Sequence, residues 1–151
     1  MRWRHATWDD LFRVELQPGQ STTILGELED TEALREVLAR FAWALVAEDD
    51  RPVAVFGLSP MWRGVAQAWG LVSLEALRTP IVLTRGVRRL LDDAVGKHGL
   101  WRIQASIHAG HDASLVWHER LGFVREGLMT AYGPDGESHH LMALVSQWAR
   151  P

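Results

Sequence analysis

The sequence contains no cysteine among its 151 residues. Disulfide bonds, thiolate nucleophiles and thiolate metal sites are therefore excluded. The sequence also lacks an uninterrupted apolar run of the roughly 18 residues that suggest a membrane span. Its opening residues, MRWRHATWDD, form no apolar signal core. We therefore expect a cytoplasmic protein without a membrane partner.

An excess of basic residues is absent as well. Sixteen lysines and arginines stand against 19 aspartates and glutamates, which gives a formal charge of −3. This balance offers no electrostatic case for nucleic acid, so we expect no such partner. The hydrophobic content of 47% and the charged content of 23% are typical of a globular protein. With no internal repeat or linker, the sequence predicts a single domain over residues 1–151.

Tryptophan is abundant, with eight residues in the chain. Large indole rings serve as core and surface anchors in many folds. They are also concentrated in protein–protein interfaces, where they dominate binding energy. The sequence leaves both interpretations open.

Hydrophobic periodicity and turn signals predict an α/β fold: early helices, three strands, a helix, a strand, a helix and two strands. A mixed, mostly antiparallel sheet with helices on both faces accommodates this order. The expected strands are 3–6, 42–47, 53–58, 65–72, 101–107, 123–129 and 138–145, and the expected helices begin near residues 7, 31, 79 and 112.

The start of the helix after the strand Val65–Val72 decides most of the functional interpretation. Thr79-Pro80 supplies a capping hydroxyl followed by proline, which favours a start at Pro80. The backbone N–H groups near Arg85 would then bond to carbonyls four residues earlier. If the helix started near Thr84 instead, those N–H groups would be free to bind a phosphate. We expect the longer helix.

The segment from His111 to Phe123, HDASLVWHERLGF, resembles the late helix of the GNAT superfamily of N-acetyltransferases. That family's signature opens on an asparagine, has a small residue three positions later, and has a tyrosine before Glu-x-x-Gly-Phe. Here His111, Ser114 and His118 stand at those positions. The corner Leu121–Phe123 is its most specific part. The resemblance implies the GNAT (acyl-CoA N-acyltransferase) fold for nearly the whole chain.

Within that superfamily the sequence is similar to GNAT-like proteins of tailed bacteriophages, of the internal virion protein type. The similarity lies in Pro52–Pro60 (PVAVFGLSP), Ala68–Gly70, Leu83–Gly86 and Ser114–Phe123. Members of that group are named either as acetyltransferases or for their place in particle assembly. The resemblance therefore implies two hypotheses, and two locations: the host cytoplasm or the virion.

The first hypothesis is acyl transfer from acetyl-CoA to an amine substrate. The resemblance then implies that a strand end holds the pantetheine arm, that a turn holds the pyrophosphate, and that one residue protonates the leaving thiolate. The implied cofactor-binding residues are Leu71, Val72, Ser73, Arg85, Gly86, Val87, Arg88 and Ser114, and the implied catalytic residue is His118.

The sequence departs from the enzymes at two of these places. Their pyrophosphate turn, Arg/Gln-x-x-Gly-x-Gly/Ala, is here reduced to Arg85–Arg88, which has one glycine. The strand Val65–Val72 carries no carboxylate that could act as a base. No metal site is expected, since His139 and His140 point to opposite faces of one strand.

The second hypothesis is a catalytically degenerate protein that acts by binding. Its partners would be phage structural proteins or further copies of this chain. The exposed tryptophans expected to mediate that docking are Trp8, Trp62 and Trp148.

Overall fold

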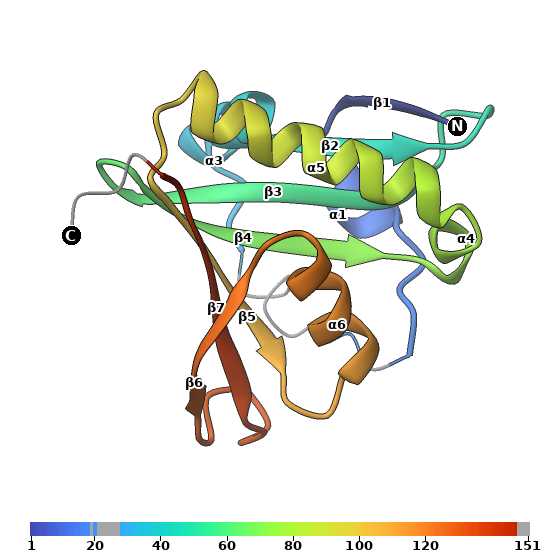
Figure 1. Cartoon of the computed structure of the whole chain (residues 1–151). Helices are drawn as coiled ribbons and strands as arrows, with labels where there is room; N and C mark the ends of the chain where they lie inside the picture. Colours follow the sequence, from blue (N-terminus) through green and yellow to red (C-terminus); the bar gives the residue numbers. More distant parts are fainter. Residues whose placement is uncertain (19, 21–27, 148–151) are drawn as a thin grey trace. The chain divides into compact units, whose positions relative to one another are not determined.

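The computed structural model describes residues 1–18, 20 and 28–147, and its elements follow the predicted order (Figure 1). The strands are β1 (Arg2–His5), β2 (Ala42–Val46), β3 (Pro52–Trp62), β4 (Val65–Val72), β5 (Arg102–His108), β6 (Val124–Met129) and β7 (His139–Val145). The helices are α1 (Asp10–Arg13), α3 (Glu32–Phe41), α4 (Leu74–Leu77), α5 (Pro80–Gly96) and α6 (Asp112–Arg120).

The chain forms two compact units. Unit 1 contains residues 1–59 and 69–87, and unit 2 contains residues 60–68 and 88–151. Strands β3 and β4 and helix α5 each run through both units. The prediction of a single domain over residues 1–151 stays a prediction.

The strands form one mixed sheet in the order β1-β2-β3-β4-β5-β7-β6. Strand β4 pairs with β5 in parallel, and the register covers only Val65–Gln67 against Arg102–Gln104. The pairs β1–β2, β2–β3, β5–β7 and β6–β7 are antiparallel. The mostly antiparallel α/β sheet predicted from the sequence is therefore confirmed.

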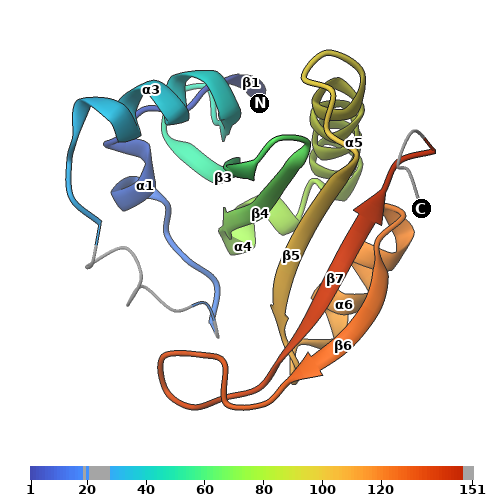
Figure 2. The same ribbon diagram turned by 90° about the vertical axis from the view of Figure 1, so that its left-hand side faces the viewer.

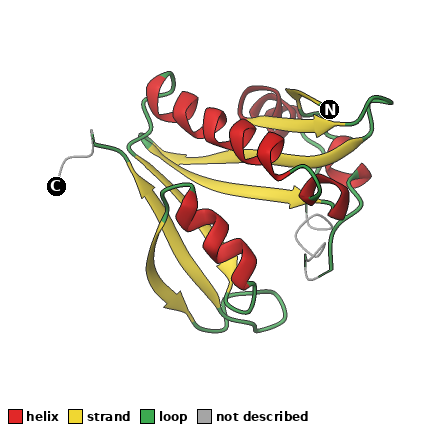
Figure 3. Ribbon diagram, turned by 45° about the vertical axis from the view of Figure 1, so that its right-hand side comes forward, coloured by secondary structure: helices red, strands yellow, loops and turns green. Residues whose placement is uncertain are grey.

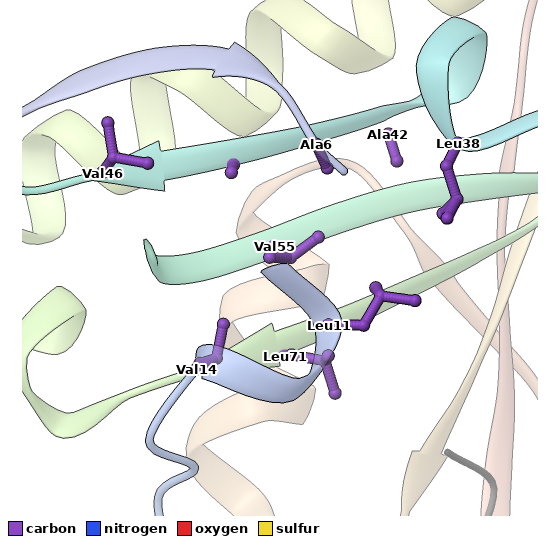
Figure 4. Packing of buried hydrophobic residues seen from close by; sticks show 9 residues of the cluster. Ala6, Leu11, Val14, Leu38, Ala42, Val46, Val55 and Leu71 are labelled. Carbon is purple, nitrogen blue, oxygen red and sulfur yellow. The ribbon is translucent and has the colours of Figure 1, made fainter. Parts of the chain in front are cut away.

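In unit 1 the helices α1 and α3 lie on one face of the strands and α5 lies on the other (Figure 2). Helix α3 begins as predicted, because the Thr31 hydroxyl accepts a hydrogen bond from the N–H of Leu34 at 3.1 Å. Apolar side chains from the first face form one buried cluster (Figure 4). Its members are Ala6, Leu11, Val14, Leu38, Ala42, Ala44, Val46, Val55 and Leu71.

A buried ion pair fixes α1 to β1. The Asp10 carboxylate is fully buried and accepts two hydrogen bonds from the Arg4 guanidinium, at 2.6 and 3.0 Å. It also accepts from the N–H and the hydroxyl of Thr7, at 2.8 and 3.0 Å. Helix α1 begins at Asp10 rather than near residue 7, so the expected start is corrected, and the Arg4 contact was not predicted. Arg4 also reaches Asp50, which in turn bonds Arg2.

Aromatic rings fill the space above several glycines. A Cβ placed on Gly57 would collide with the Trp69 indole, and one on Gly70 would lie 2.7 Å from the Phe56 ring. Each strand of the β3–β4 pair thus carries an aromatic ring that lies against a glycine of the other. The Phe56 ring therefore occupies the space beside Gly70.

In unit 2, α6 packs against one face of the strands β5, β7 and β6 (Figure 3). The helix ends in a Schellman motif, as the N–H groups of Gly122 and Phe123 donate to the carbonyls of Glu119 and His118 at 3.0 Å each. Gly122 has φ +102, a left-handed backbone conformation that glycine adopts without a Cβ penalty. The buried side chains here are Ile103, Ala105, Leu115, Leu121, Phe123, Met142 and Ala143.

Three local features differ from the prediction. Helix α4 was not predicted, and it begins where the Ser73 hydroxyl accepts from the N–H of Ala76 at 3.1 Å. Helix α6 is capped by Nδ1 of His111 rather than by Asp112. Trp101, where β5 was expected to begin, precedes that strand, and its ring lies against Gly64. Among the described residues, no helix combines the length and apolar character required to cross a bilayer.

Candidate functional site

The site residues expected from the sequence fall into two groups. Leu71–Ser73 and Arg85–Val87 belong to unit 1, whereas Arg88, Ser114 and His118 belong to unit 2. Each group is built by different elements and has its own local chemistry.

The C-terminal end of β4 offers the main-chain groups expected to hold a pantetheine arm. The N–H of Ser73 donates to the carbonyl of Val53 in β3 at 3.0 Å. Because main-chain groups alternate in direction along a strand, those of Val72 point away from β3. The Val72 carbonyl accepts from the N–H of Gln17 at 3.1 Å, and the Val72 N–H donates to the side-chain oxygen of Gln20 at 3.0 Å.

The side chains on either side of Val72 have structural roles. Ser73 is 5% exposed, and its hydroxyl caps α4. Leu71 is 8% exposed and belongs to the unit 1 cluster. Of the three residues expected to bind the arm, Val72 has main-chain groups on the strand edge opposite β3. Those groups are bonded within the chain itself.

Helix α5 is continuous from Pro80 through Gly96, which confirms the longer of the two alternatives. The backbone N–H groups of Arg85–Arg88 therefore lie inside a helix, where they bond to carbonyls four residues earlier. They cannot form the phosphate cradle that a start at Thr84 would have created. A phosphate-binding role for this segment would have to rest on the guanidinium groups.

Two members of this segment have other roles. Gly86 provides space for β1, because a Cβ there would collide with the Trp3 indole. Arg88 donates from Nη2 to the carbonyl of Arg120 at the end of α6, at 3.0 Å. Arg85 is exposed on α5, and it remains the side chain of the segment best placed to meet an anion.

The first turn of α5 was not considered from the sequence. The helix's first internal bond runs from the N–H of Leu83 to the carbonyl of Thr79, at 3.0 Å. Pro80 has no N–H, so the N–H groups without an internal helical partner are those of Ile81 and Val82. The positive end of the helix dipole lies at the same place. The Thr79-Pro80 signal that set this boundary also locates these donors.

In unit 2, helix α6 brings His111, Ser114 and His118 together. Nδ1 of His111 accepts from the N–H of Ser114 at 3.0 Å, as an N-cap side chain does at a helix start. Nδ1 of His118 lies 2.8 Å from the carbonyl oxygen of Ser114 and 3.4 Å from its hydroxyl. The rings of Trp117 and Phe123 meet the His118 ring edge-on, at 5.2 and 5.3 Å between centroids.

This geometry changes the proton chemistry expected of His118. A carbonyl oxygen only accepts, so Nδ1 carries the proton and Nε2 carries the lone pair in the neutral ring. Burial lowers the pKa of His118 below its ordinary value, the bond to Ser114 opposes that shift, and His111 adds to it. A neutral imidazole at pH 7 takes up a proton at Nε2 more readily than it donates one. The protonation of a leaving thiolate, the role that the resemblance implies for His118, requires the protonated ring, and that role stays a prediction.

Stability should depend on pH through His118. Its pKa is lower in the folded chain than in the unfolded chain, so the unfolded state binds the proton first as the pH falls below about 6.5. The free energy of unfolding should therefore decrease across that range. A His118→Gln variant should show a smaller decrease. Denaturant unfolding of both proteins at about pH 7.5 and about pH 5.5 would measure the difference, and equal pH dependence would contradict the assignment.

A row of polar side chains on β5 was missed by the sequence interpretation. Gln67 on β4 accepts from Gln104 at 3.2 Å and donates to the Ser106 hydroxyl at 3.4 Å. The Ser106 hydroxyl lies 3.4 Å from that of Tyr132, and Arg102 links Gln104 to Glu126. Alternation along a strand places residues 102, 104 and 106 on one face, which the sequence showed, but the partners come from other elements.

Two histidines of unit 2, His108 and His139, lie beside each other at the end of this row. His108 lies opposite His139 in the sheet register, and their ring centroids are 5.5 Å apart. Nδ1 of His108 accepts from the N–H of Gly110, so its proton lies on Nε2, the nitrogen a metal would need. No group of three or more His, Cys, Asp or Glu in the described part of the chain is placed to hold a metal ion.

The tryptophans expected to mediate docking differ in exposure. Trp62 ends β3 and is 65% exposed, beside Met61 at 43%. Trp8 is half-buried against the unit 1 cluster and contacts Phe12, so its description as an exposed residue is corrected. Trp148 lies outside the described residues.

Solved structures of acetyltransferases share this fold. Ribosomal-protein-S5-alanine acetyltransferase from Vibrio fischeri is 18% identical, with a TM-score of 0.76 over 99% of this chain and 94% of that one. A GNAT-family acetyltransferase from Bacillus anthracis is 14% identical, with a TM-score of 0.69 over 95% and 93% of the two chains.

A chain of the NatC complex bound to Gag peptide and CoA is also 14% identical, with a TM-score of 0.70 over 97% of this chain and 98% of that one. No family model matches the sequence, and no curated protein matches it. At these identities the likeness shows the fold, which is that of the GNAT acetyltransferases.

Proposed function

We propose that this chain transfers an acetyl group from acetyl-CoA to an amine. The observation that carries the proposal is the end of β4 in unit 1. There the main-chain groups of Val72 point away from β3, and the N-terminus of α5 follows within the same unit. A strand edge pairs with the amides of a pantetheine arm, and helix N–H groups bind phosphate. The CoA bound in the NatC structure supports acetyl-CoA as the ligand.

The proposal moves the expected pyrophosphate contacts toward the start of α5. The N–H groups of Ile81 and Val82 would bind the phosphates in place of those of Arg85–Arg88. Arg85 is four residues after Ile81, so its side chain lies on the same face one turn away. Its guanidinium would add charge-assisted hydrogen bonds to a phosphate.

Titration with acetyl-CoA by calorimetry tests the proposal. Micromolar binding is the expected result, and the absence of heat at about 1 mM ligand would contradict it. An Arg85→Gln variant should bind about tenfold more weakly, since a hydrogen bond between charged groups contributes about 1.5–3 kcal/mol. Arg89→Gln is the matched control, because Arg89 is also exposed on α5 but lies about 12 Å from Ile81 along the helix. Equal losses of acetyl-CoA affinity in both variants would contradict the placement of the phosphates beside Ile81 and Arg85.

A second candidate is a GNAT-fold protein that acts by binding, such as a phage virion or assembly protein. Two observations favour it. The Val72 main-chain groups are bonded within the chain, and Trp62 and Met61 are exposed at the end of β3. Such a protein would give no heat with acetyl-CoA. Its partners would be phage structural proteins or a second copy of the chain, and a Trp62→Ala substitution would weaken that association.

A further inference from the structure

The edge of β4 at Val72 is closed by two glutamines from the N-terminal part of the chain. Gln17 contributes its backbone N–H to the Val72 carbonyl, and Gln20 contributes its side-chain oxygen to the Val72 N–H. The N–H of Gln20 donates to the carbonyl of Gln17 at 3.3 Å, which ties the two residues together. Together they present one donor and one amide acceptor to a single strand residue.

This is the hydrogen-bonding pattern of an extended amide ligand. An arm that pairs with a strand edge offers an N–H to one carbonyl and a C=O to one N–H. The carboxamide of Gln20 has the same acceptor as a backbone or pantetheine amide. Such a ligand and the two glutamines therefore require the same two groups of Val72, and they cannot bind them at the same time.

The Gln20 contact is suited to being broken. It is a single neutral hydrogen bond from a long side chain that loses rotamer freedom when it is held. By contrast, the Ser73 N–H beside it bonds the backbone of β3. Opening the Val72 edge thus disturbs the side chain of Gln20 and the Gln17 N–H while the β3–β4 pair stays intact.

We infer that Gln17 and Gln20 compete with the coenzyme for Val72, so that acetyl-CoA binds only when they release the strand edge. This inference rests on the proposed function. A site that is closed for part of the time has an apparent affinity reduced by the fraction that is open. The contact of Gln17 and Gln20 with Val72 would therefore determine the acetyl-CoA concentration at which half of the protein is bound.

A Gln20→Ala variant tests the inference, with Gln17→Ala as its matched control. Gln20→Ala removes the acceptor, whereas Gln17→Ala keeps the backbone N–H that contacts Val72. Calorimetry with acetyl-CoA should show about fivefold tighter binding by Gln20→Ala, the value of one neutral hydrogen bond, and unchanged binding by Gln17→Ala. Hydrogen exchange at the Val72 N–H should be faster in free Gln20→Ala than in the free wild-type protein.

The outcomes separate the inference from the proposed function. Equal binding by the wild type and by Gln20→Ala would overturn the inference and leave the proposed function standing. Equal protection of the Val72 N–H in both free proteins would overturn it as well. No binding of acetyl-CoA by any of the three proteins would overturn the proposed function, and with it the coenzyme as the ligand that displaces Gln20.

Discussion

An Arg4→Ala variant is expected to lose about 3–5 kcal/mol of its free energy of unfolding. The Asp10 carboxylate is fully buried, and Arg4 provides two of its hydrogen bonds. Without the guanidinium, Thr7 would be the remaining close partner, and Arg13 lies 3.9 Å away. A buried charge without a counterion is costly because it has lost its hydration. Urea unfolding followed by tryptophan fluorescence measures the loss.

The control for this prediction is Arg2→Ala. Arg2 also bonds a carboxylate, but its partner Asp50 is exposed, so little or no change in stability is expected. A double variant, Arg4→Met with Asp10→Leu, should recover most of the loss, since apolar side chains of similar size can replace a buried ion pair. Similar losses in Arg4→Ala and Arg2→Ala would show that the buried pair contributes little.

The same pair predicts an acid-sensitive contribution. Burial alone would raise the pKa of Asp10, but the hydrogen bonds from Arg4 and Thr7 outweigh it and hold the pKa below its ordinary value. The stabilisation is therefore present above the ordinary pKa of about 3.9 and is lost as the pH falls through the lowered value. The difference between the wild type and Arg4→Ala should narrow in that range.

Gly86→Ala is expected to destabilise the chain by about 1–3 kcal/mol, although alanine is the better helix former. In an open helix the change would stabilise by about 1 kcal/mol. Here the added methyl group would collide with the Trp3 indole, so β1 and α5 would have to move apart. Thermal unfolding of the variant, with the wild type alongside, measures the sign directly.

A double-mutant cycle identifies the cause of that loss. Trp3→Leu removes the ring atoms that the Gly86 methyl group would meet, at the cost of a cavity. In the Trp3→Leu background, Gly86→Ala should therefore be neutral or stabilising. A loss of the same size in both backgrounds would mean that the ring contact is not responsible.

Local signals in the sequence were sufficient to predict most of the helices and strands and most of the residues at which they begin and end. The Thr31 hydroxyl and Pro80 act on residues a few positions away, so the starts of α3 and α5 could be predicted. The capping role expected of the Thr79 hydroxyl is corrected, because that hydroxyl donates to the carbonyl of Ala76 in α4. Helix α4 was missed because four residues carry too little periodicity, although Ser73 followed by Glu75 is a recognisable start. The length of α5 was the local feature with the largest functional consequence.

The contacts that define the candidate site depend on residues distant in the sequence. Nothing near Val72 indicates that Gln17 and Gln20 bond it, and nothing near Gly86 indicates Trp3. The role of Gly86 was therefore interpreted as a phosphate turn, whereas its neighbour across the fold explains it. The tautomer of His118 and the lowering of its pKa have a similar origin, since the Ser114 carbonyl sets the tautomer and burial lowers the pKa.

The glycine–aromatic contacts also bear on how this sequence can vary. In three pairs a tryptophan ring occupies the space that a side chain on a glycine would need: Trp69 with Gly57, Trp101 with Gly64 and Trp3 with Gly86. In a single-site mutational scan both members of such a pair should score as sensitive, because a side chain on the glycine meets the ring and a smaller residue in place of the tryptophan leaves a cavity. Related sequences should therefore exchange the two members together, and combinatorial libraries that randomise them jointly should recover solutions that one-at-a-time substitution never samples.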